Sequence, residues 1–390
     1  MRAMIKILAG VLALTMLLSM KAFATENDSA EQSGEPPVEI AAASALLMDA
    51  ATGQVLIAYN EHEPRYPASV TKVMTLLLVA EAIEQGKIAL TDKITASGTA
   101  AGKGGSQIWL REGESMTAEE LIKAIAIYSA NDASVALAEA IAGSEEGFVT
   151  LMNERARELG MNNTTFLNST GLDDTAEGHL TTAYDIALMS RELLRHENIT
   201  AYSTIWMDSL RGGETELVNT NRLVRFFEAA TGLKTGTTNK AGCCIAASAR
   251  RGETHFIAVV LGSGNSNDRF DTAKRMLNWG FANYSTVTPE IDPTLITPVR
   301  VLRGAEQFIQ PVLPAAMPIL VPRGSESELR HSIDLAVDVQ APVEAGQILG
   351  MVTLTIDGET LGEYPLTAPA DIAAATWPMM VRRLFTALIG

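Results

Sequence analysis

Just ahead of an apolar-rich run at residues 70–85, the 390-residue chain reads Pro67-Ala68-Ser69-Val70-Thr71-Lys72. The run predicts a buried helix that begins within this stretch. Residues three apart on a helix lie on one face, one turn apart, so we expect the hydroxyl of Ser69 and the amine of Lys72 to be neighbours. The start of a helix also offers unpaired N–H groups and the positive end of the helix dipole.

This pair of residues has the chemistry of an activated nucleophile. A serine hydroxyl attacks a carbonyl only when a base accepts its proton. A lysine can be that base if burial or a nearby cation lowers its pKa, because desolvation disfavours the ammonium form. The N–H of Ser69 is then placed to bind a developing oxyanion. The same spacing also arises by chance, as a capping serine beside a solvated lysine, so the pair needs support from elsewhere in the chain.

Two further motifs supply that support. Ser129-Ala130-Asn131 begins 60 residues after Ser69, and Lys234-Thr235-Gly236 begins 165 residues after it. The order S-x-x-K, S-x-N, K-T-G is the motif set of serine β-lactamases and penicillin-binding proteins. The K-T-G motif precedes an apolar run at residues 243–249, so we expect it on an edge strand that forms one wall of a cleft. A glycine in that strand lets a substrate backbone approach closely.

Other catalytic systems find no support in the sequence. None of the five histidines has a metal-binding spacing such as H-E-x-x-H, and neither a G-x-S-x-G elbow nor a Walker-type phosphate loop occurs. We therefore expect no metal and no organic cofactor. The two cysteines, Cys243 and Cys244, are adjacent, and neighbours on a strand point to opposite faces, so we expect small core residues and no disulfide. Trp109 is predicted to be a core residue, and His179 and Asp132 are predicted to be structural.

The beginning of the chain is typical of an exported protein. Residues 1–24 have a charged start, an apolar run and the small-residue ending Ala22-Phe23-Ala24, which predicts a signal peptide. Residues 25–37 are polar and end in two prolines, as a flexible leader would. The formal net charge of −16 argues against nucleic acid as a partner, because phosphates require a basic patch.

The remainder divides into two regions by periodicity. Hairpins are predicted at residues 40–60, turning at Thr52-Gly53, and at residues 243–263, turning at Arg251-Gly252-Glu253. The segments with helical period are residues 70–85, 117–141 (capped by Thr117), 145–160, 181–196 and 268–284. From about residue 286 the chain becomes rich in Pro, Val and Thr, which predicts a linker near residues 286–293 and a small all-β domain at residues 290–372.

The chain ends in a predicted amphipathic helix at residues 376–390. Its apolar side chains recur at steps of three and four, and Arg382 and Arg383 lie off the apolar face. Such a helix can lie in a membrane surface, with arginines near anionic lipid and a tryptophan at the interface. The alternative is a helix packed on its own domain.

The sequence resembles the low-molecular-mass penicillin-binding proteins that act as D-alanyl-D-alanine carboxypeptidases, in the subgroup with a C-terminal β-domain. Besides the three motifs, the matching segments are Leu159-Gly160-Met161, Thr165-Phe166, Gly171-Leu172, His179 with Thr181-Thr182-Ala183, Ala241-Gly242 and Trp279-Gly280-Phe281. The resemblance implies an α/β (α+β) catalytic domain at residues 38–285, with an antiparallel sheet flanked by helices and the active cleft between the sheet and a helical lobe. The sequence departs from the family at Cys243, where an aromatic residue is usual.

The resemblance also implies the catalytic roles. Ser69 attacks the carbonyl of the penultimate D-alanine, and Lys72 takes the Ser69 proton. Ser129 relays a proton towards the leaving amine, and Asn131 binds the substrate backbone.

The K-T-G strand is implied to bind the other end of the substrate. Lys234 lowers the pKa of Lys72 and, with Thr235, binds the terminal carboxylate. Gly236 lies beside them, and the N–H of Thr237 joins that of Ser69 in the oxyanion hole. The implied partners are peptidoglycan stem peptides, with β-lactams as covalent inhibitors, and the implied location is the outer face of the cytoplasmic membrane.

Three alternatives stay open on the sequence alone. A D,D-endopeptidase of the same fold would differ only in which D-alanyl amide fits the cleft. A β-lactamase would need a deacylating base, and the nearest string to its Glu-x-x-Leu-Asn element, at residues 158–162, is imperfect. A non-catalytic envelope-binding protein would use the cleft or the β-domain only for docking.

Overall fold

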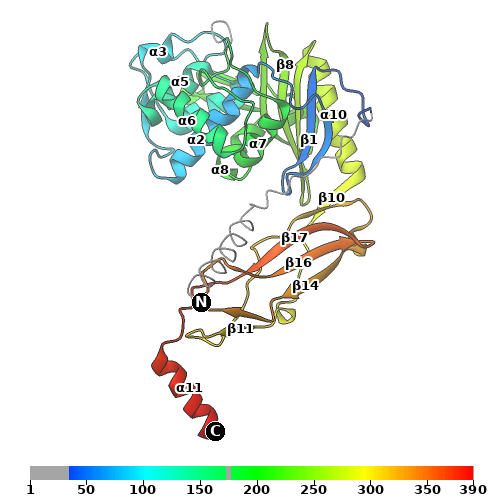
Figure 1. Cartoon of the computed structure of the whole chain (residues 1–390). Coiled ribbons are helices and arrows are strands. Elements are labelled where there is room, and N and C mark those ends of the chain that lie inside the picture. Colours follow the sequence, from blue (N-terminus) through cyan, green and yellow to red (C-terminus); the bar gives the residue numbers. More distant parts are fainter. Residues whose placement is uncertain (1–34, 173–176, 390) are drawn as a thin grey trace, which may run out of the picture. The chain divides into compact units, whose positions relative to one another are not determined.

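The computed structural model of the chain describes residues 35–172 and 177–389 (Figure 1). The predicted signal peptide at residues 1–24 and most of the predicted leader at residues 25–37 lie outside the described residues.

A five-stranded antiparallel sheet forms the centre of the catalytic region. In their order across the sheet, its strands are β2 (Val55–Tyr59), β1 (Ser44–Asp49), β9 (Thr254–Ser263), β8 (Gly242–Arg251) and β7 (Ala230–Thr238). The two predicted hairpins are confirmed as β1–β2 and β8–β9, because each apolar run ends at the turn residues that predicted it. Strand β7 carries the K-T-G motif and is an edge strand, as predicted.

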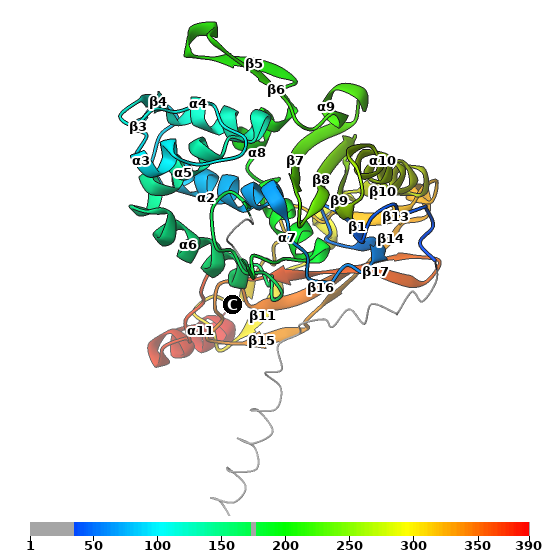
Figure 2. The same cartoon turned by 90° about the horizontal axis from the view of Figure 1, so that it is seen from above.

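Both faces of this sheet are buried, and alternate residues of each strand serve alternate faces. On β1, Leu46 and Met48 join the apolar cluster of one face, whereas Ala45 and Leu47 join that of the other. Figure 2 shows α2, α5 and α6 on one side of the sheet and α10 on the other. The helices that contribute to the first cluster are α2 (Lys72–Glu84), α4 (Ala118–Lys123), α5 (Asn131–Ala142), α6 (Glu145–Glu158) and α7 (Ala183–Leu193), and the helix of the second is α10 (Ser266–Asn283).

Several short elements complete this region. The short helices are η1 (Ala68–Thr71), α3 (Gly98–Ala101), α8 (Glu197–Thr200), η3 (Ala201–Thr204), η4 (Arg211–Gly213) and α9 (Leu223–Phe226). Two small hairpins pair β3 (Lys93–Thr95) with β4 (Ser115–Thr117) and β5 (Met207–Leu210) with β6 (Thr215–Val218).

The predicted helix at residues 117–141 is broken at the S-x-N motif. Thr117 caps α4, as predicted, and forms a capping box with Glu120. Helix α4 continues into the π-helix η2 (Ala124–Tyr128), and Ser129 then adopts φ +68°. Because a left-handed residue ends a helix, α5 has to start afresh at Asn131. Ser129 is therefore turned out of the helix that precedes it.

The C-terminal region is all β apart from short turns and the terminal helix, in agreement with the predicted fold class. Its strands are β10 (Tyr284–Val287), β11 (Val299–Leu302), β12 (Phe308–Ile309), β13 (Ile319–Pro322), β14 (Arg330–Leu335), β15 (Asp338–Gln340), β16 (Ile348–Ile356) and β17 (Glu359–Thr367), and its 3-10 turns are η5 (Pro293–Leu295) and η6 (Glu326–Glu328). They pair in the orders β14-β16-β17, β12-β11-β15 and β10-β13 around two apolar clusters.

The predicted linker at residues 286–293 starts too early. Thr286 belongs to β10 and is buried, because its hydroxyl donates to Asp49 at 3.0 Å and its N–H donates to Thr254 Oγ1 at 2.8 Å. These partners are distant in sequence, so local composition did not reveal them.

Helix α11 (Trp377–Ile389) lies where the sequence predicts a terminal helix. Its large apolar side chains are exposed, and Trp377 and Leu388 are 75% and 74% accessible. The part of the chain that the structure describes contains no helix long and apolar enough to cross a membrane.

Candidate active site

The nucleophile–base pair predicted at the start of the first helix is formed. Ser69 lies in η1 and Lys72 is the first residue of α2, which follows without interruption. The Lys72 amine is 2.9 Å from Ser69 Oγ, within hydrogen-bond distance. It also donates to Asn131 Oδ1 at 2.6 Å and to the carbonyl of Thr170 at 2.8 Å. Three separate segments of the chain therefore meet at one amine.

Burial tunes this amine to act as a base. Lys72 is fully buried, and this desolvation holds its pKa well below the ordinary value for lysine. The positive charge of Lys234 lowers the pKa further, whereas the carboxylate of Asp132 raises it. A neutral amine has two N–H donors, which suffice for Asn131 and Thr170, and its lone pair then faces the Ser69 hydroxyl. The arrangement can thus accept the serine proton.

The S-x-N motif faces the same amine. Asn131 is buried at the first turn of α5, and its Nδ2 donates to the carbonyl of Gly104 at 2.6 Å while its Oδ1 accepts from Lys72. Both ends of this amide are thus engaged, and one Nδ2 hydrogen is left for a substrate. Ser129 is nearly buried, and its hydroxyl makes no hydrogen bond to any other described residue. Its left-handed backbone turns it away from η2.

The K-T-G motif forms the edge of the sheet beside Ser69. A Cβ at Gly236 would lie 2.7 Å from the backbone nitrogen of Ser69, so only glycine lets β7 pack against η1. The close approach that Gly236 permits is therefore to the nucleophile's own backbone. Lys234 is buried and donates to the carbonyl of Thr235 at 2.8 Å; burial, followed by the charge of Arg269, lowers the pKa of Lys234 to about 7. Thr235 donates to Thr220 at 2.7 Å.

Arg269 is a functional candidate that the sequence did not single out. It lies in the first turn of α10 and is nearly buried, which lowers its pKa. Its Nη1 donates to the carbonyl of Gly236 and to the hydroxyl of Thr237, both at 2.9 Å. The guanidinium thus fixes the end of β7 that passes Ser69. No motif marks this arginine, because it comes from an amphipathic helix on the far face of the sheet.

The segment at residues 168–171 is a second missed part of the site. The Asn168 side chain accepts from the N–H groups of Thr170 and Gly171, at 3.1 Å and 2.7 Å. Glu145 accepts from both the N–H and the hydroxyl of Ser169 and is paired with Lys103, just before the loop that bears Gly104. These contacts hold the Thr170 carbonyl against Lys72. They also tie it to the loop that covers Asn131.

Two of the residues predicted to be structural have buried structural contacts. The ring of His179 accepts at Nδ1 from the N–H of Leu167 and is bonded through Nε2 to Thr71 at 2.9 Å; burial lowers the pKa of His179 to about 4, so the ring is neutral at pH 7. The Asp132 carboxylate accepts from the N–H groups of Ile108 and Leu110.

The prediction for Trp109 is wrong. Its side chain is 74% exposed, because Asp132 binds the N–H groups on either side of it and the backbone between them turns the indole outward.

The thiols of Cys243 and Cys244 are both free, as predicted. Cys244 is buried, but Cys243 is half-buried and pairs across the strands with Thr237, so it borders the cleft wall where the family usually has an aromatic residue.

One cluster has the spacing of a metal site, but its charges are already paired. Glu81, Glu192 and His196 bring their ligand atoms within 4.8 Å of one another. Arg155 donates to Glu81 at 2.8 Å and to Glu192 at 2.9 Å, so an arginine already neutralises both carboxylates.

Known proteins share this arrangement over nearly the whole chain. Residues 29–265 match the family described as D-alanyl-D-alanine carboxypeptidase, and residues 284–374 match the C-terminal domain of penicillin-binding protein 5. The chain belongs to the D-alanyl-D-alanine carboxypeptidase family. The family, the fold class and the enzyme class that the three motifs predict are confirmed by these matches.

Individual relatives extend the likeness to both regions of this carboxypeptidase. The chain is 42% identical over 360 residues to D-alanyl-D-alanine carboxypeptidase DacF of Bacillus subtilis, covering 91% of this chain and 92% of the relative. Penicillin-binding protein 5 from Haemophilus influenzae superposes with a TM-score of 0.77 at 31% identity, covering 87% of this chain and all of that one. Penicillin-binding protein D2 from Listeria monocytogenes, solved in its cefotaxime-bound form, superposes with a TM-score of 0.58 at 28% identity over 63% of this chain and all of that one.

The environment of Lys72 predicts how acylation depends on pH. Acylation needs a neutral Lys72, so its rate rises with pH as Lys72 loses its proton. Replacing Lys234 by Met removes a charge that lowers the pKa of Lys72, so the rising limb moves to higher pH. The limb stays below the ordinary lysine range, because burial is the larger cause. Stopped-flow acylation by a fluorescent penicillin across pH measures this; a Lys234→Met limb that stays in place or moves to lower pH contradicts it.

Proposed function

We propose that this carboxypeptidase removes the terminal D-alanine from peptidoglycan stem pentapeptides through an acyl-enzyme on Ser69. One observation carries the proposal. In a chain of this family, a fully buried amine with a lowered pKa lies 2.9 Å from the hydroxyl of the serine in the S-x-x-K motif. General acid–base catalysis needs this geometry, with the base within hydrogen-bond reach of the proton it takes.

In the acylation step, Ser69 Oγ passes its proton to Lys72 and bonds to the carbonyl carbon of the penultimate D-alanine. The negative charge that develops on the carbonyl oxygen is bound by the N–H groups of Ser69 and Thr237. The packing of Gly236 against η1 and the hold of Arg269 on Thr237 support this role, since donors fixed in advance need no reorganisation.

The leaving group departs as the amide C–N bond breaks. Its nitrogen receives a proton that passes from Lys72 through Ser129, so D-alanine leaves as a neutral amine. Asn131 holds Lys72 and offers its remaining Nδ2 hydrogen to the substrate backbone.

The terminal carboxylate binds to Lys234 and Thr235 on β7. Water then adds to the ester, Ser69 regains its proton, and a tetrapeptide carboxylate is released. A β-lactam presents a similar carboxylate and strained amide, so it acylates Ser69 in the same way.

Among the alternatives, carboxypeptidase activity has the better support. The relatives that the chain matches over more than four-fifths of its length are named D-alanyl-D-alanine carboxypeptidases. Neither a lactamase nor a binding protein accounts for a match of that length together with an intact set of three motifs.

Product analysis by mass spectrometry distinguishes the peptidase activities. Soluble protein comprising residues 25–375 is given monomeric pentapeptide muropeptides and cross-linked dimers together. We expect each monomer to lose one D-alanine while the dimers remain intact. Splitting of the dimers would assign an endopeptidase, and no cleavage of either would revive the binding-protein alternative.

Ser69→Ala is the matched control for this experiment. It removes one half-buried oxygen and leaves the fold intact, so it is expected to abolish both D-alanine release and the covalent penicillin adduct. A variant that retains activity contradicts the role of Ser69.

We further propose that the enzyme is exported by residues 1–24 and works on the outer face of the cytoplasmic membrane, held there by α11. The catalytic domain is assigned to residues 38–285 and the β-domain to residues 290–372. Exposed apolar side chains support the membrane role of the helix, since Trp377, Leu384 and Leu388 are each more than half accessible. Its only charged residues are Arg382 and Arg383, which suit an anionic lipid surface.

Deletion of residues 376–390 tests the membrane role. The truncated enzyme is expected to move from the membrane to the soluble fraction of cells while retaining peptidase activity, because the deletion leaves both sheet regions intact. Trp377→Ser with Leu384→Ser is expected to weaken binding to vesicles that contain anionic phospholipid. A truncated enzyme that sediments with membranes as the full chain does would contradict the proposal.

A further inference from the structure

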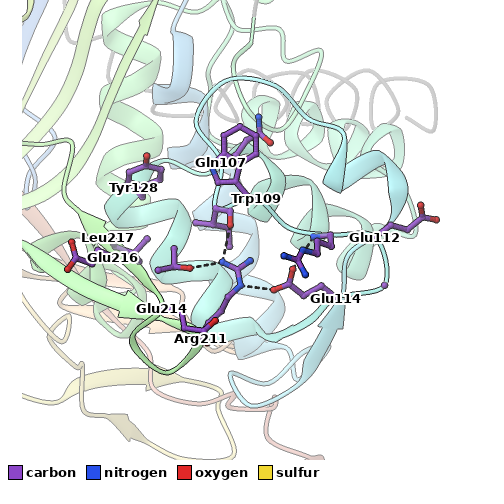
Figure 3. Close-up of a pocket in the computed structure, with 13 residues that line it drawn as sticks. Gln107, Trp109, Glu112, Glu114, Tyr128, Arg211, Glu214, Glu216 and Leu217 are labelled. Atoms are coloured by element: carbon purple, nitrogen blue, oxygen red, sulfur yellow. Dashed lines mark hydrogen bonds and ion pairs between the residues drawn. The ribbon is translucent and has the colours of Figure 1, made fainter.

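A pocket of about 910 Å³ lies beside the S-x-N motif, between residues 107–114 and the β5–β6 hairpin (Figure 3). Its lining includes Tyr128, the neighbour of Ser129 in the chain. The loop that forms one wall is tied to the catalytic residues, because the N–H of Asn131 donates to the carbonyl of Ser106 at 2.7 Å. The pocket is thus a lateral extension of the active site.

One wall of the pocket holds an aromatic side chain in solvent by force of its backbone. Trp109 has φ +60°, which is unfavourable for a bulky residue and persists only where the surroundings impose it. Buried Asp132 imposes it by binding the N–H groups of Ile108 and Leu110. A second aromatic ring, that of Tyr128, is 37% exposed in the same lining. The catalytic motif itself therefore positions exposed aromatic rings at this rim.

The second wall is fixed to the first by Arg211. Its guanidinium donates to Glu114 at 2.7 Å, and to the carbonyl of Ile108 and the hydroxyl of Thr215, both at 2.9 Å. Figure 3 shows these bonds joining the two walls. The bond from Arg211 also lowers the pKa of the Glu114 carboxyl, so both charges are satisfied and the pocket is preformed.

The remaining charges of the lining are mainly acidic. They are the carboxylates of Glu112, Glu214 and Glu216 and the guanidinium of Arg111. None of these four side chains forms an ion pair with another described residue. In Figure 3 the carboxylates of Glu112 and Glu216 stand at opposite rims, so they act on a ligand through their field. A cation is the ligand that gains both from this field and from a face of Trp109 or Tyr128.

We propose that this pocket is a subsite for a primary ammonium group on the side chain of the residue that precedes D-Ala-D-Ala in the substrate. The inference rests on the proposed function, which places the scissile carbonyl at Ser69. Consecutive Cα atoms are about 3.8 Å apart, so a lysine-like side chain on that residue carries its amine to about 10 Å from the carbonyl. The lateral pocket, whose lining starts next to Ser129, lies within that reach.

Tripeptides that differ only at this amine test the proposal. The substrates are Nα-acetyl-X-D-Ala-D-Ala with X as L-lysine, Nε-acetyl-lysine, norleucine or meso-diaminopimelate, and the readout is kcat/KM for D-alanine release. The full-length enzyme is expected to prefer lysine over norleucine by about tenfold, the effect of roughly 1.4 kcal/mol. Trp109→Ala and the double variant Glu214→Gln/Glu216→Gln are each expected to reduce that ratio at least threefold, as is 0.5 M salt for the wild type.

Phe226→Ala is the matched control, because Phe226 is an aromatic residue of 67% exposure outside this pocket, and its ratio should equal that of the wild type. Equal rates for the lysyl and diaminopimelyl peptides support a site for the shared ammonium. A preference confined to diaminopimelate and lost in Arg111→Gln would assign the pocket to a carboxylate and overturn the proposal. Equal rates for lysine and norleucine would also overturn it. No cleavage of any peptide, with no penicillin adduct, would mark failure of the proposed function itself.

Discussion

The whole active site is built around one amine that has been removed from water. Burial of an ammonium costs several kcal/mol even after relaxation, so a buried lysine is kept neutral or is paired. Lys72 has three hydrogen-bond contacts, with Ser69, Asn131 and Thr170. Each comes from a different segment, so the lysine can be buried only when η1, the start of α5 and the segment at residues 168–171 have all come together. Assembly of the fold and activation of the nucleophile are therefore one event.

Two glycines let the neighbouring segments come close enough for this. Gly236 allows β7 to reach the backbone of Ser69, and Gly171, at φ +83°, lies against Ala68 so closely that a Cβ would overlap its carbonyl. Both positions exclude any other residue on steric grounds alone. The charges of the site follow a similar economy, because Lys234 on β7 lowers the pKa of Lys72 while Arg269 lowers that of Lys234. Positive charge is thus available for a substrate carboxylate beside an amine that stays a base.

Local patterns predicted the elements, and the motifs predicted the core of the site. The turn at residues 251–253, the cap at Thr117 and the pair Ser69 and Lys72 all depend on neighbours within a few positions, where periodicity and spacing carry the information. Contacts between distant segments were not predictable in this way. The hold of Arg269 on β7 is an example, since that arginine follows Gly236 by 33 residues.

The exposed position of Trp109 has the same origin. A tryptophan in an apolar stretch is normally buried, but here a carboxylate 22 residues beyond Leu110 fixes the backbone on either side. The predicted linker failed for a related reason, because the partners of Thr286 belong to a different sheet. In each case composition described the residue correctly, and a single long-range polar contact decided its place.

The ionisation of Lys72 in the free enzyme tests the account most directly. Its side chain can be followed by NMR of protein with 13C-labelled lysine, with Lys72→Arg used to assign the signal. We predict a titration midpoint well below that of the exposed lysines. A midpoint in the ordinary lysine range would show that Lys72 is protonated when Ser69 reacts, and would contradict its role as the base.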